Sequence, residues 1–506
     1  MQNVLKWGIL LVLFLPSFYF AARQKKWYLY LLLAFIGILP EQFSFRLHES
    51  LPLLTVSRML IIMAAGFWFY DRTQTKKWSI PWAIAAFLGV NLLISLIHLF
   101  SDSDEINRMF IFVTERVLVV VMLKDLLTTR EEFDRGVDFL IGGSCALAVI
   151  GILQTMFDYD VSSVLHLTKT YTSIQLLPRM GLTRAFGTFN AISYGCYCAI
   201  MLIPIYYRLK QTDRQRYSLA FALNIMALLC TFTRSAWLGI VGVMGLLFLT
   251  QPKKFILCLW KGVVMTMVLC LVLCLIQPKL GSAVLETGKS SANTLLQVLP
   301  DSWFQKNPSA GDADVTDSTG STDATDATEP EETTPEPEKP GFDLSDDFGA
   351  NASDPAYSRN VQWTAVKYMA REGTLILGYG YNALREGKIH FHYKQWGDDY
   401  KPTNYLDVGW VAVIAEGGLI YLLSFIGLLG YIFVQALRKW KQDGDFGFYK
   451  ASGFIVIYIL VINVLASYLN AGSVWLLLGL YFAYENLDKQ NALSVPEEKP
   501  HKKWQF

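Results

Sequence analysis

The chain has 506 residues, of which 53% are hydrophobic and 17% are charged, and its formal net charge is +1. Soluble globular proteins carry about 25% charged residues, so this composition argues against a soluble enzyme. The small net charge gives no field that would attract nucleic acid, and no nucleic-acid partner is expected. The apolar residues gather in uncharged runs near the length of helix that spans a bilayer, about 20 residues. The sequence therefore predicts an all-α, polytopic membrane protein.

The first apolar run is predicted to be a membrane span that is retained, not a signal peptide. Arg23-Gln-Lys-Lys26 follows it at once as a basic stop-transfer flank, and no small-residue cleavage site precedes that flank. Apolar spans then continue along the chain, at residues 4–22, 27–40, 53–70, 79–100, 109–126, 137–157, 187–207, 217–232, 235–250, 255–276, 405–437, 451–468 and 471–487. The second, eighth and ninth are short, so the sequence predicts twelve or thirteen spans.

The connections between the spans differ in their content of Lys and Arg. The basic connections lie at residues 23–26, 72–77, 124–135, 208–216, 253–254, 438–450 and 499–503. Cytoplasmic loops hold the excess of Lys and Arg, so these connections and the C-terminus are predicted to be cytoplasmic. The large loop between Gln277 and Asn404 is then extracytoplasmic. With thirteen spans the N-terminus lies outside, and with twelve it lies inside.

The chain is predicted to have four regions: N-terminal transmembrane helices at 1–276, an extracytoplasmic loop at 277–404, C-terminal transmembrane helices at 405–487 and a cytoplasmic tail at 488–506. Within the loop, residues 309–340 are mostly Thr, Asp, Glu, Ala and Pro. Such a segment cannot bury enough apolar surface to fold, which predicts a disordered acidic spacer. Asp354-Pro355 is typical of a helix cap followed by a proline in the first turn, and it predicts a helix at about 356–371. Gly378-Tyr-Gly380 predicts a turn after that helix.

Three arginines are predicted to lie at the outer membrane face. Arg184 ends an external loop, Arg234 occupies a tight turn between the eighth and ninth spans, and Arg359 lies in the loop helix. A guanidinium group binds phosphate oxygens in a bidentate fork, so these residues suit a di-anionic lipid headgroup.

Other ionisable residues have more than one interpretation. Arg58 and the Glu115-Arg116 pair lie inside apolar spans, where such residues indicate function, a helix partner or snorkelling to the interface. His390 and His392 can accept a proton near neutral pH, as transfer to a hydroxyl acceptor requires. Their alternation is equally consistent with a surface strand or a weak metal site.

Short motifs follow one another between about residues 180 and 430. They are Arg184-Ala-Phe-Gly-Thr-Phe-Asn190, Thr233-Arg-Ser-Ala-Trp-Leu-Gly239, Ser358-Arg359 with Trp363, Gly378-Tyr-Gly380, Asn404-Tyr-Leu406 and Glu416-Gly-Gly-Leu-Ile420. In this order around one long external loop, they resemble the O-antigen ligase and O-antigen polymerase family of bacterial polysaccharide assembly. The resemblance implies a glycosyltransferase in the bacterial inner (cytoplasmic) membrane. It would move a glycan from a polyprenyl-diphosphate carrier to a sugar hydroxyl of an acceptor glycan or glycolipid at the outer face.

The resemblance also implies roles for individual residues, in an inverting reaction that uses no metal or other cofactor. Three arginines are assigned to the donor diphosphate: Arg184, Arg234 and Arg359. The catalytic candidates are two loop histidines and two lesser carboxylates: His392, His390, Glu416 and Asp407. Ligases of this family have His directly before the Asn of Asn-Tyr-Leu, where this chain has Thr403, and this departure favours a polymerase.

Two alternatives come from other classes of protein. A transporter or lipid flippase explains the number of spans equally well, although the sequence shows no internal repeat of the kind that transporters often have. A sensor or scaffold could use the large loop as a binding module, but this function would leave the external arginines without a purpose.

Overall fold

The computed structural model describes residues 2–23, 26–35, 44–45, 54–75, 80–100, 105–157, 181–188, 191–212, 214–298, 357–381, 390–391, 401–402, 406, 408–441, 446–468 and 472–494. Its helices are α1 (Gln2–Ala22), α2 (Trp27–Phe35), α3 (Val56–Thr75), α4 (Trp82–Leu99), α5 (Glu105–Phe112), the π-helix η1 (Val113–Leu118), α6 (Val119–Leu126), α7 (Arg130–Phe157), α9 (Ala191–Gln211), α10 (Gln215–Cys230), α11 (Arg234–Thr250), α12 (Pro252–Ile276), α13 (Lys279–Val298), α14 (Tyr357–Arg371), α15 (Gly409–Lys439), α16 (Phe448–Leu465) and α17 (Gly472–Ser494). The described strands form two antiparallel pairs, β1 (Ser44–Phe45) with β2 (Leu54–Thr55) and β3 (His390–Phe391) with β4 (Lys401–Pro402).

The prediction of an all-α membrane protein is confirmed. Five of the described helices, α4, α7, α9, α12 and α15, are long and apolar enough to cross a membrane. Each predicted apolar span overlaps at least one described helix, and the span at 109–126 covers the end of α5 and all of η1 and α6. The number of helices that cross the membrane stays a prediction.

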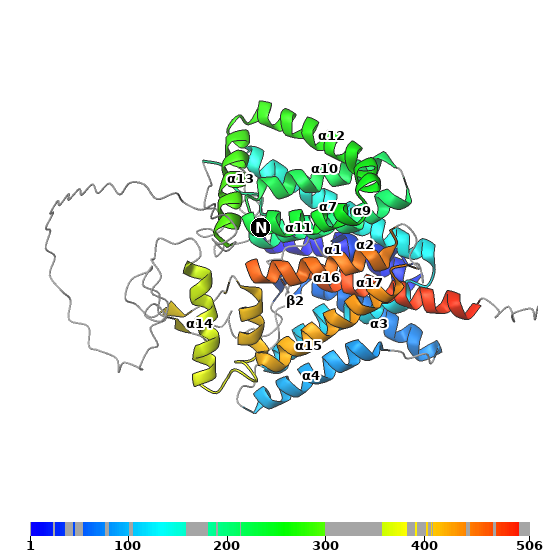
Figure 1. The fold of residues 1–506 in the computed structure, drawn as a ribbon. Coiled ribbons are helices and arrows are strands. Elements are labelled where there is room, and N and C mark those ends of the chain that lie inside the picture. Colours follow the sequence, from blue (N-terminus) through cyan, green and yellow to red (C-terminus); the bar gives the residue numbers. More distant parts are fainter. Residues whose placement is uncertain are drawn as a thin grey trace, which may run out of the picture.

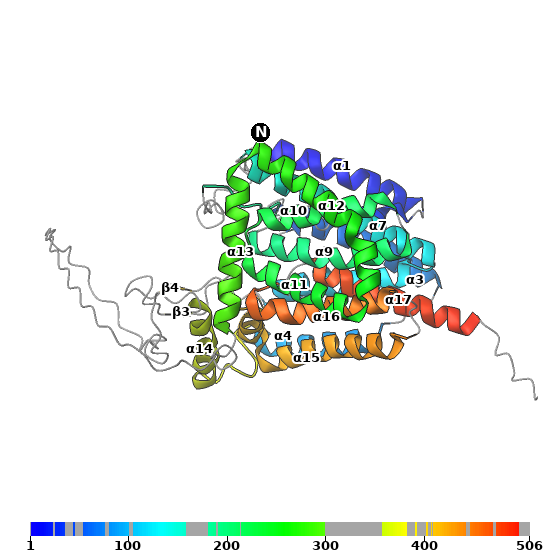
Figure 2. The same cartoon turned by 45° about the horizontal axis from the view of Figure 1, so that its top comes forward.

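Most helices run roughly parallel in one bundle, and two run across its end (Figures 1 and 2). In both views α13 and α14 lie across the ends of the other helices, and the start of α1 lies at the same end. The last helix, α17, points to the opposite end. The N-terminus and the helices of the large loop therefore share one end of the bundle. Which side of the membrane this end faces stays a prediction.

The degree of burial changes from the centre of the bundle to its edge. Nearly all side chains of α9 are buried, whereas α12 lies at the edge of the bundle (Figure 1) and exposes many apolar side chains, among them Leu257, Leu271 and Leu275. A contiguous apolar surface of this kind is typical of a membrane contact.

Helix α13 was not predicted, since the sequence analysis assigned its residues to the start of the large loop. Its buried residues are Leu280, Ala283, Thr287 and Ser291, which share one helical face. The hydroxyl groups of Thr287 and Ser291 donate to the carbonyl oxygens of Ala283 and Thr287, at 2.8 and 2.7 Å. These local bonds satisfy the buried hydroxyls, so the face packs on the bundle although it is half polar.

The helix predicted at 356–371 agrees with α14, which buries Ala365 and Met369. The predicted acidic spacer at 309–340 lies outside the described residues.

Candidate functional site

The motifs that contain Arg184 and Arg234 meet in the structure. A tight turn at residues 231–233 joins α10 to α11, and Phe232 has a φ of 50°, which is uncommon for a residue other than glycine. The Nε of Arg184 donates to the carbonyl oxygen of Thr231 at 2.9 Å, and its Nη2 donates to Oγ1 of Thr233 at 3.0 Å. We call residues 184–187 together with 231–234 the arginine turn.

The other side of the arginine turn is held by α7. The side chain of Gln154 is fully buried, and its Nε2 donates to the carbonyl oxygen of Gly187 at 2.9 Å. Its Oε1 accepts hydrogen bonds from the backbone N–H groups of Phe186 and Gly187, at 3.2 and 2.8 Å. Gly187 has a φ of 57° and lies so close to the ring of Tyr194 that a Cβ would be 3.0 Å from it. The segment is thus fixed from both sides, and sequence analysis did not identify Gln154.

These contacts give the two arginines different positions. Arg184 directs Nε and one Nη at atoms of the turn itself, so it fixes the conformation of the turn. Arg234 is the half-buried first residue of α11. The backbone N–H groups and the helix dipole at such a position favour an anion.

A second pair of predicted motifs meets at a kink in α15. Gly418 has φ 68° and ψ −169°, a conformation that is essentially restricted to glycine. Residues 374–381 lie along the kink. The N–H groups of Tyr379 and Gly380 donate to the carbonyl oxygens of Ala415 and Glu416, at 2.9 and 3.0 Å. In return the N–H of Leu419 donates to the carbonyl oxygen of Leu375 at 2.9 Å. We call residues 415–420 with 374–381 the α15 kink.

The close approach of the two backbones requires glycine. A Cβ added to Gly418 would lie 2.1 Å from the carbonyl oxygen of Ile376. A Cβ added to Gly378, whose φ is 73°, would lie 2.6 Å from the carbonyl oxygen of Glu416. Neither contact is sterically possible without a shift of the backbone.

Arg116 connects the α15 kink to the membrane helices. It is buried in η1, and a π-helical turn is frequent at functional sites. Its Nη2 donates to the hydroxyl of Tyr381 at 2.6 Å, and its Nη1 donates to the hydroxyl of Tyr421. Its guanidinium carbon lies 4.6 Å from the ring centroid of Tyr381 and 5.6 Å from that of Trp475. Residues 374–381 are therefore tied to α15 and η1 by side chains as well as by backbone.

Two ion pairs lie near Arg116, and we refer to them together with Arg116 as the charged cluster. The Nε of Arg58 lies 2.6 Å from Oε1 of Glu115, so these two predicted residues are partners of one another. The Nη1 of Arg108 lies 3.0 Å from Oε2 of Glu105, and both side chains are buried. Sequence analysis did not single out this second pair, because it lies at the edge of an apolar span where charges are common.

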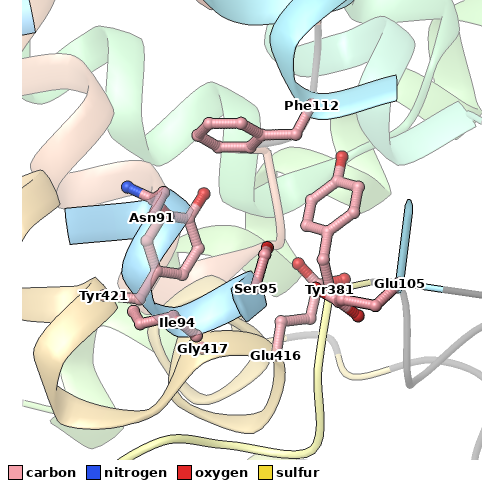
Figure 3. Close-up of a pocket in the computed structure, with 9 residues that line it drawn as sticks. All are labelled: Asn91, Ile94, Ser95, Glu105, Phe112, Tyr381, Glu416, Gly417 and Tyr421. Atoms are coloured by element: carbon pink, nitrogen blue, oxygen red, sulfur yellow. The ribbon is translucent and has the colours of Figure 1, made fainter. Parts of the chain in front are cut away.

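A small cavity lies beside these groups (Figure 3). Its lining comes from α4, α5, α15 and the segment 374–381 that follows α14: Asn91, Ile94, Ser95, Glu105, Phe112, Tyr381, Glu416, Gly417 and Tyr421. Figure 3 shows the carboxyl groups of Glu105 and Glu416 pointing toward one another near the Ser95 hydroxyl. We call this space the α4–α15 cavity.

The predicted site residues thus fall into separate groups. Arg184 and Arg234 belong to the arginine turn, and Glu416 belongs to the α4–α15 cavity. Arg359 lies in α14 and His390 in strand β3, but their side chains are outside the described part of the chain. His392 and Asp407 lie outside it entirely. The described residues contain no group of His, Cys, Asp and Glu that could hold a metal ion.

Helix α16 lies between the arginine turn and the α15 kink. A Cβ on Gly239 of α11 would be 3.2 Å from the ring of Tyr458 in α16. On the other side, a Cβ on Gly409 of α15 would be 2.2 Å from Oδ1 of Asn463 in α16. Helix α16 therefore packs against both α11 and α15.

The fold and its long apolar helices define a polytopic α-helical membrane protein. No protein-family model matches the chain, and no curated protein matches it. The resemblance to a glycosyltransferase family therefore depends on the motifs themselves.

Proposed function

We propose that this protein is a membrane glycosyltransferase of the O-antigen polymerase or ligase type, with a polymerase favoured. One observation supports the proposal above the others. Two pairs of motifs that are far apart in sequence are in direct contact, at the arginine turn and at the α15 kink. The segments that carry the family resemblance therefore belong to one architecture. The substrates would be a polyprenyl-diphosphate-linked glycan and an acceptor glycan or glycolipid, at the outer face of a bacterial inner membrane.

In this proposal Arg234 binds the donor diphosphate. A bond forms between the acceptor oxygen and the anomeric carbon of the donor sugar, while the bond from that carbon to the diphosphate oxygen breaks. The leaving diphosphate gains charge, which a guanidinium group and a helix N-terminus stabilise. Arg184 acts through its bonds to Thr231 and Thr233, so we treat it as a positioning residue. Arg359 remains a candidate for the same diphosphate.

The acceptor hydroxyl must lose its proton in this reaction. His392 and His390 are the proposed bases, since imidazole accepts a proton near neutral pH. Glu416 is the weaker candidate, because α16 lies between it and the arginine turn.

The test is the pair of substitutions Arg234→Lys and Arg234→Ala, with polymer and membrane protein measured in the same cells. Lysine keeps the charge but loses the bidentate fork, so polymer per molecule of protein should fall about ten- to a hundred-fold, the effect of one charge-assisted hydrogen bond. The matched control is Arg135→Lys, because the Arg135 side chain is 66% exposed at the opposite end of the bundle. Near-normal polymer from both Arg234 variants would contradict the proposal.

Arg184→Lys separates the two arginine roles. A lysine has one nitrogen in place of the two that bond to Thr231 and Thr233, and it lacks the rigid fork of arginine. This variant should therefore lower the thermal stability and the amount of protein together with the polymer. A loss of polymer from a fully stable Arg184→Lys protein would instead indicate that Arg184 binds substrate directly.

Transport of a lipid-linked glycan is the second candidate function. The observation that favours it is the break in α15 beside buried Glu416, because transporters bind their substrates at discontinuous helices. Purified protein in liposomes distinguishes the two functions. A glycosyltransferase joins glycans that are supplied on one face, whereas a transporter moves the lipid-linked glycan across the bilayer without changing it.

A further inference from the structure

Helix α12 is the least buried of the five described helices that are long and apolar enough to cross a membrane. Its exposed apolar side chains are spaced by three, four or seven residues, so they form one stripe along the helix: Leu257, Val264, Val268, Leu271 and Leu275. No charged residue occurs between Gly262 and Ile276. We call these five side chains the apolar stripe, and their exposure on one face suits the acyl chains of a lipid.

The apolar stripe begins among three lysines and a tryptophan. Lys253 and Lys254 are exposed in the first turn of α12, Trp260 is 52% exposed, and Lys261 is half-buried. Lys254 and Lys261 are seven residues apart, so they lie on one side of the stripe. Lys253 and Trp260 have the same spacing and lie on its other side. We call these four residues the basic end of α12.

The position of Lys261 along the helix limits where its charge can lie. It follows Pro252, the first residue of α12, by nine positions, which is about 13 Å along the helix axis. A charge at this depth on a lipid-exposed helix is costly unless the ammonium group reaches the headgroups. Helix side chains tilt toward the N-terminus of their helix, so the Lys261 stem is directed to that side. Tryptophans such as Trp260 are enriched at the same boundary.

The helices around the basic end supply little negative charge. Helix α12 packs against α9, α10 and α11. Residues 191–276, which include all four of these helices, contain one acidic residue, Asp213, against eight lysines and arginines. On α7, Asp138 already contacts Arg208 and Arg216, at 2.8 and 2.7 Å. The excess of positive charge suits an anion at the membrane surface.

We propose that the basic end of α12 binds the headgroup of an anionic phospholipid, whose acyl chains lie along the apolar stripe. The two parts are continuous on one helix, and a phospholipid joins an anionic headgroup to apolar chains in the same order. The ammonium groups of Lys254 and Lys261 donate to the phosphate oxygens, and the indole N–H of Trp260 is a further donor to the headgroup. The inference is independent of the proposed function, because no glycan takes part.

The experiment compares two lipids that differ in charge. Full-length protein in detergent is mixed with phosphatidylglycerol or with phosphatidylcholine of the same acyl chains, and bound lipid is measured by native mass spectrometry. We expect phosphatidylglycerol to bind more tightly. Lys261→Gln should weaken its binding about five-fold, the effect of one lysine near an anionic surface, and Lys254→Gln together with Lys261→Gln about twenty-five-fold. Lys261→Arg keeps the charge and should bind as the wild-type protein does.

The matched control is Arg135→Gln, which removes an exposed positive charge on α7 at the same end of the bundle. Helix α9, which contacts the start of α7 through Arg208, also meets the start of α12, since the ring centroids of Tyr206 and Phe255 are 5.7 Å apart. This variant should bind phosphatidylglycerol normally, and thermal unfolding shows whether each variant is folded. Equal affinity of the wild-type protein for both lipids would overturn the inference. Equal losses from Arg135→Gln and Lys261→Gln would also overturn it, by showing a general attraction between charges.

A short-chain polyprenyl diphosphate tests the other lipid that has an anionic head and an apolar tail. If the lysine substitutions weaken binding of this diphosphate and leave phosphatidylglycerol binding unchanged, the basic end binds the donor substrate and the inference is overturned. If they weaken phosphatidylglycerol binding while polymer formation stays normal, the inference holds and the proposed function is unaffected. Normal polymer from both Arg234 variants would contradict the proposed function alone.

Discussion

The two ends of the helix bundle each contain a buried charged cluster, and the clusters differ in how completely their charges are paired. The first cluster lies where α7 begins and α9 ends, around Arg208. The Nε and Nη2 atoms of Arg208 contact the two carboxylate oxygens of Asp138 at 2.8 and 3.2 Å, and its Nη1 contacts Asp134 at 3.0 Å. The Tyr217 hydroxyl and Arg216 add two further bonds to Asp138, at 2.6 and 2.7 Å.

The second cluster surrounds the α4–α15 cavity at the other end. It has ion pairs of similar length, but it leaves Oε1 of Glu105 without a hydrogen-bond partner among the described residues. The two clusters also differ in exposure: the Asp134 and Asp138 side chains are 23% and 22% exposed, whereas those of Arg108 and Glu105 are 4% and 1% exposed. A buried acceptor without a hydrogen-bond partner is uncommon in folded proteins, and this atom sets the second cluster apart.

The largest loss of stability is expected from a substitution in the first cluster, at Arg208. Arg208→Met removes the partner of two partly buried aspartates, and loss of one partner of a buried ion pair costs about 3 kcal/mol or more. Because the Asp138 side chain is 22% exposed, we expect a cost at the lower end of that range, about 3 kcal/mol. Thermal unfolding in detergent measures it. Polymer per folded molecule should be unchanged.

The control for this change is Arg135→Met. Arg135 forms an exposed pair with Glu131 at 3.8 Å on the same helix, and exposed pairs contribute little. Its loss should change stability by less than about 0.5 kcal/mol. Equal stability losses from Arg208→Met and Arg135→Met would show that the Arg208 cluster has no structural role.

A smaller loss of stability, with a larger loss of function, is expected at the α15 kink. Gly418→Ala places a side chain in a backbone conformation that is essentially restricted to glycine, which costs about 2 kcal/mol. The Cβ also displaces residues 374–381, so polymer per molecule of protein should fall. Gly427→Ala is the matched control, because a Cβ at that position of α15 meets nothing within 4 Å. A Gly418→Ala protein with wild-type polymer formation and stability would show that the kink is dispensable.

The sequence predicts the helices better than the contacts between them. Apolar runs near 20 residues long are a local signal, and each of them overlaps a described helix. Helix α13 was missed because Thr287 and Ser291 on its buried face interrupt the apolar pattern, and their hydroxyl bonds become evident only in the structure. The π-helical turn at η1 has no sequence signal comparable to a cap or an apolar period.

At the candidate sites too, the sequence predicts the local motifs better than the contacts between them. Glycine motifs were identified at Gly378-Tyr-Gly380 and Glu416-Gly-Gly418, but local patterns do not encode the pairing of two segments so distant in sequence. The sequence likewise suggests arginine chemistry at Arg184 but does not show that two of its nitrogens bond to a turn. Glu105 and Arg108 have the composition of an ordinary loop end, and only their burial distinguishes them.

The smallest effect is expected from the acidic spacer, which the sequence predicts to be disordered. Deleting residues 312–338 should leave protein level, stability and polymer nearly unchanged, because a segment that cannot fold contributes few contacts. Shortening the large loop by this amount changes its closure free energy by only about 0.2 kcal/mol. A second variant, in which a Gly/Ser segment of equal length replaces 312–338, separates loop length from composition. Normal protein level with no polymer in both variants would show that the acidic residues bind substrate, which would place part of the site in the loop. If only the deletion lost polymer, the length of the loop and not its acidic composition would be the requirement. The loop would then need a minimum length to connect the N-terminal helices to the C-terminal helices in the active arrangement.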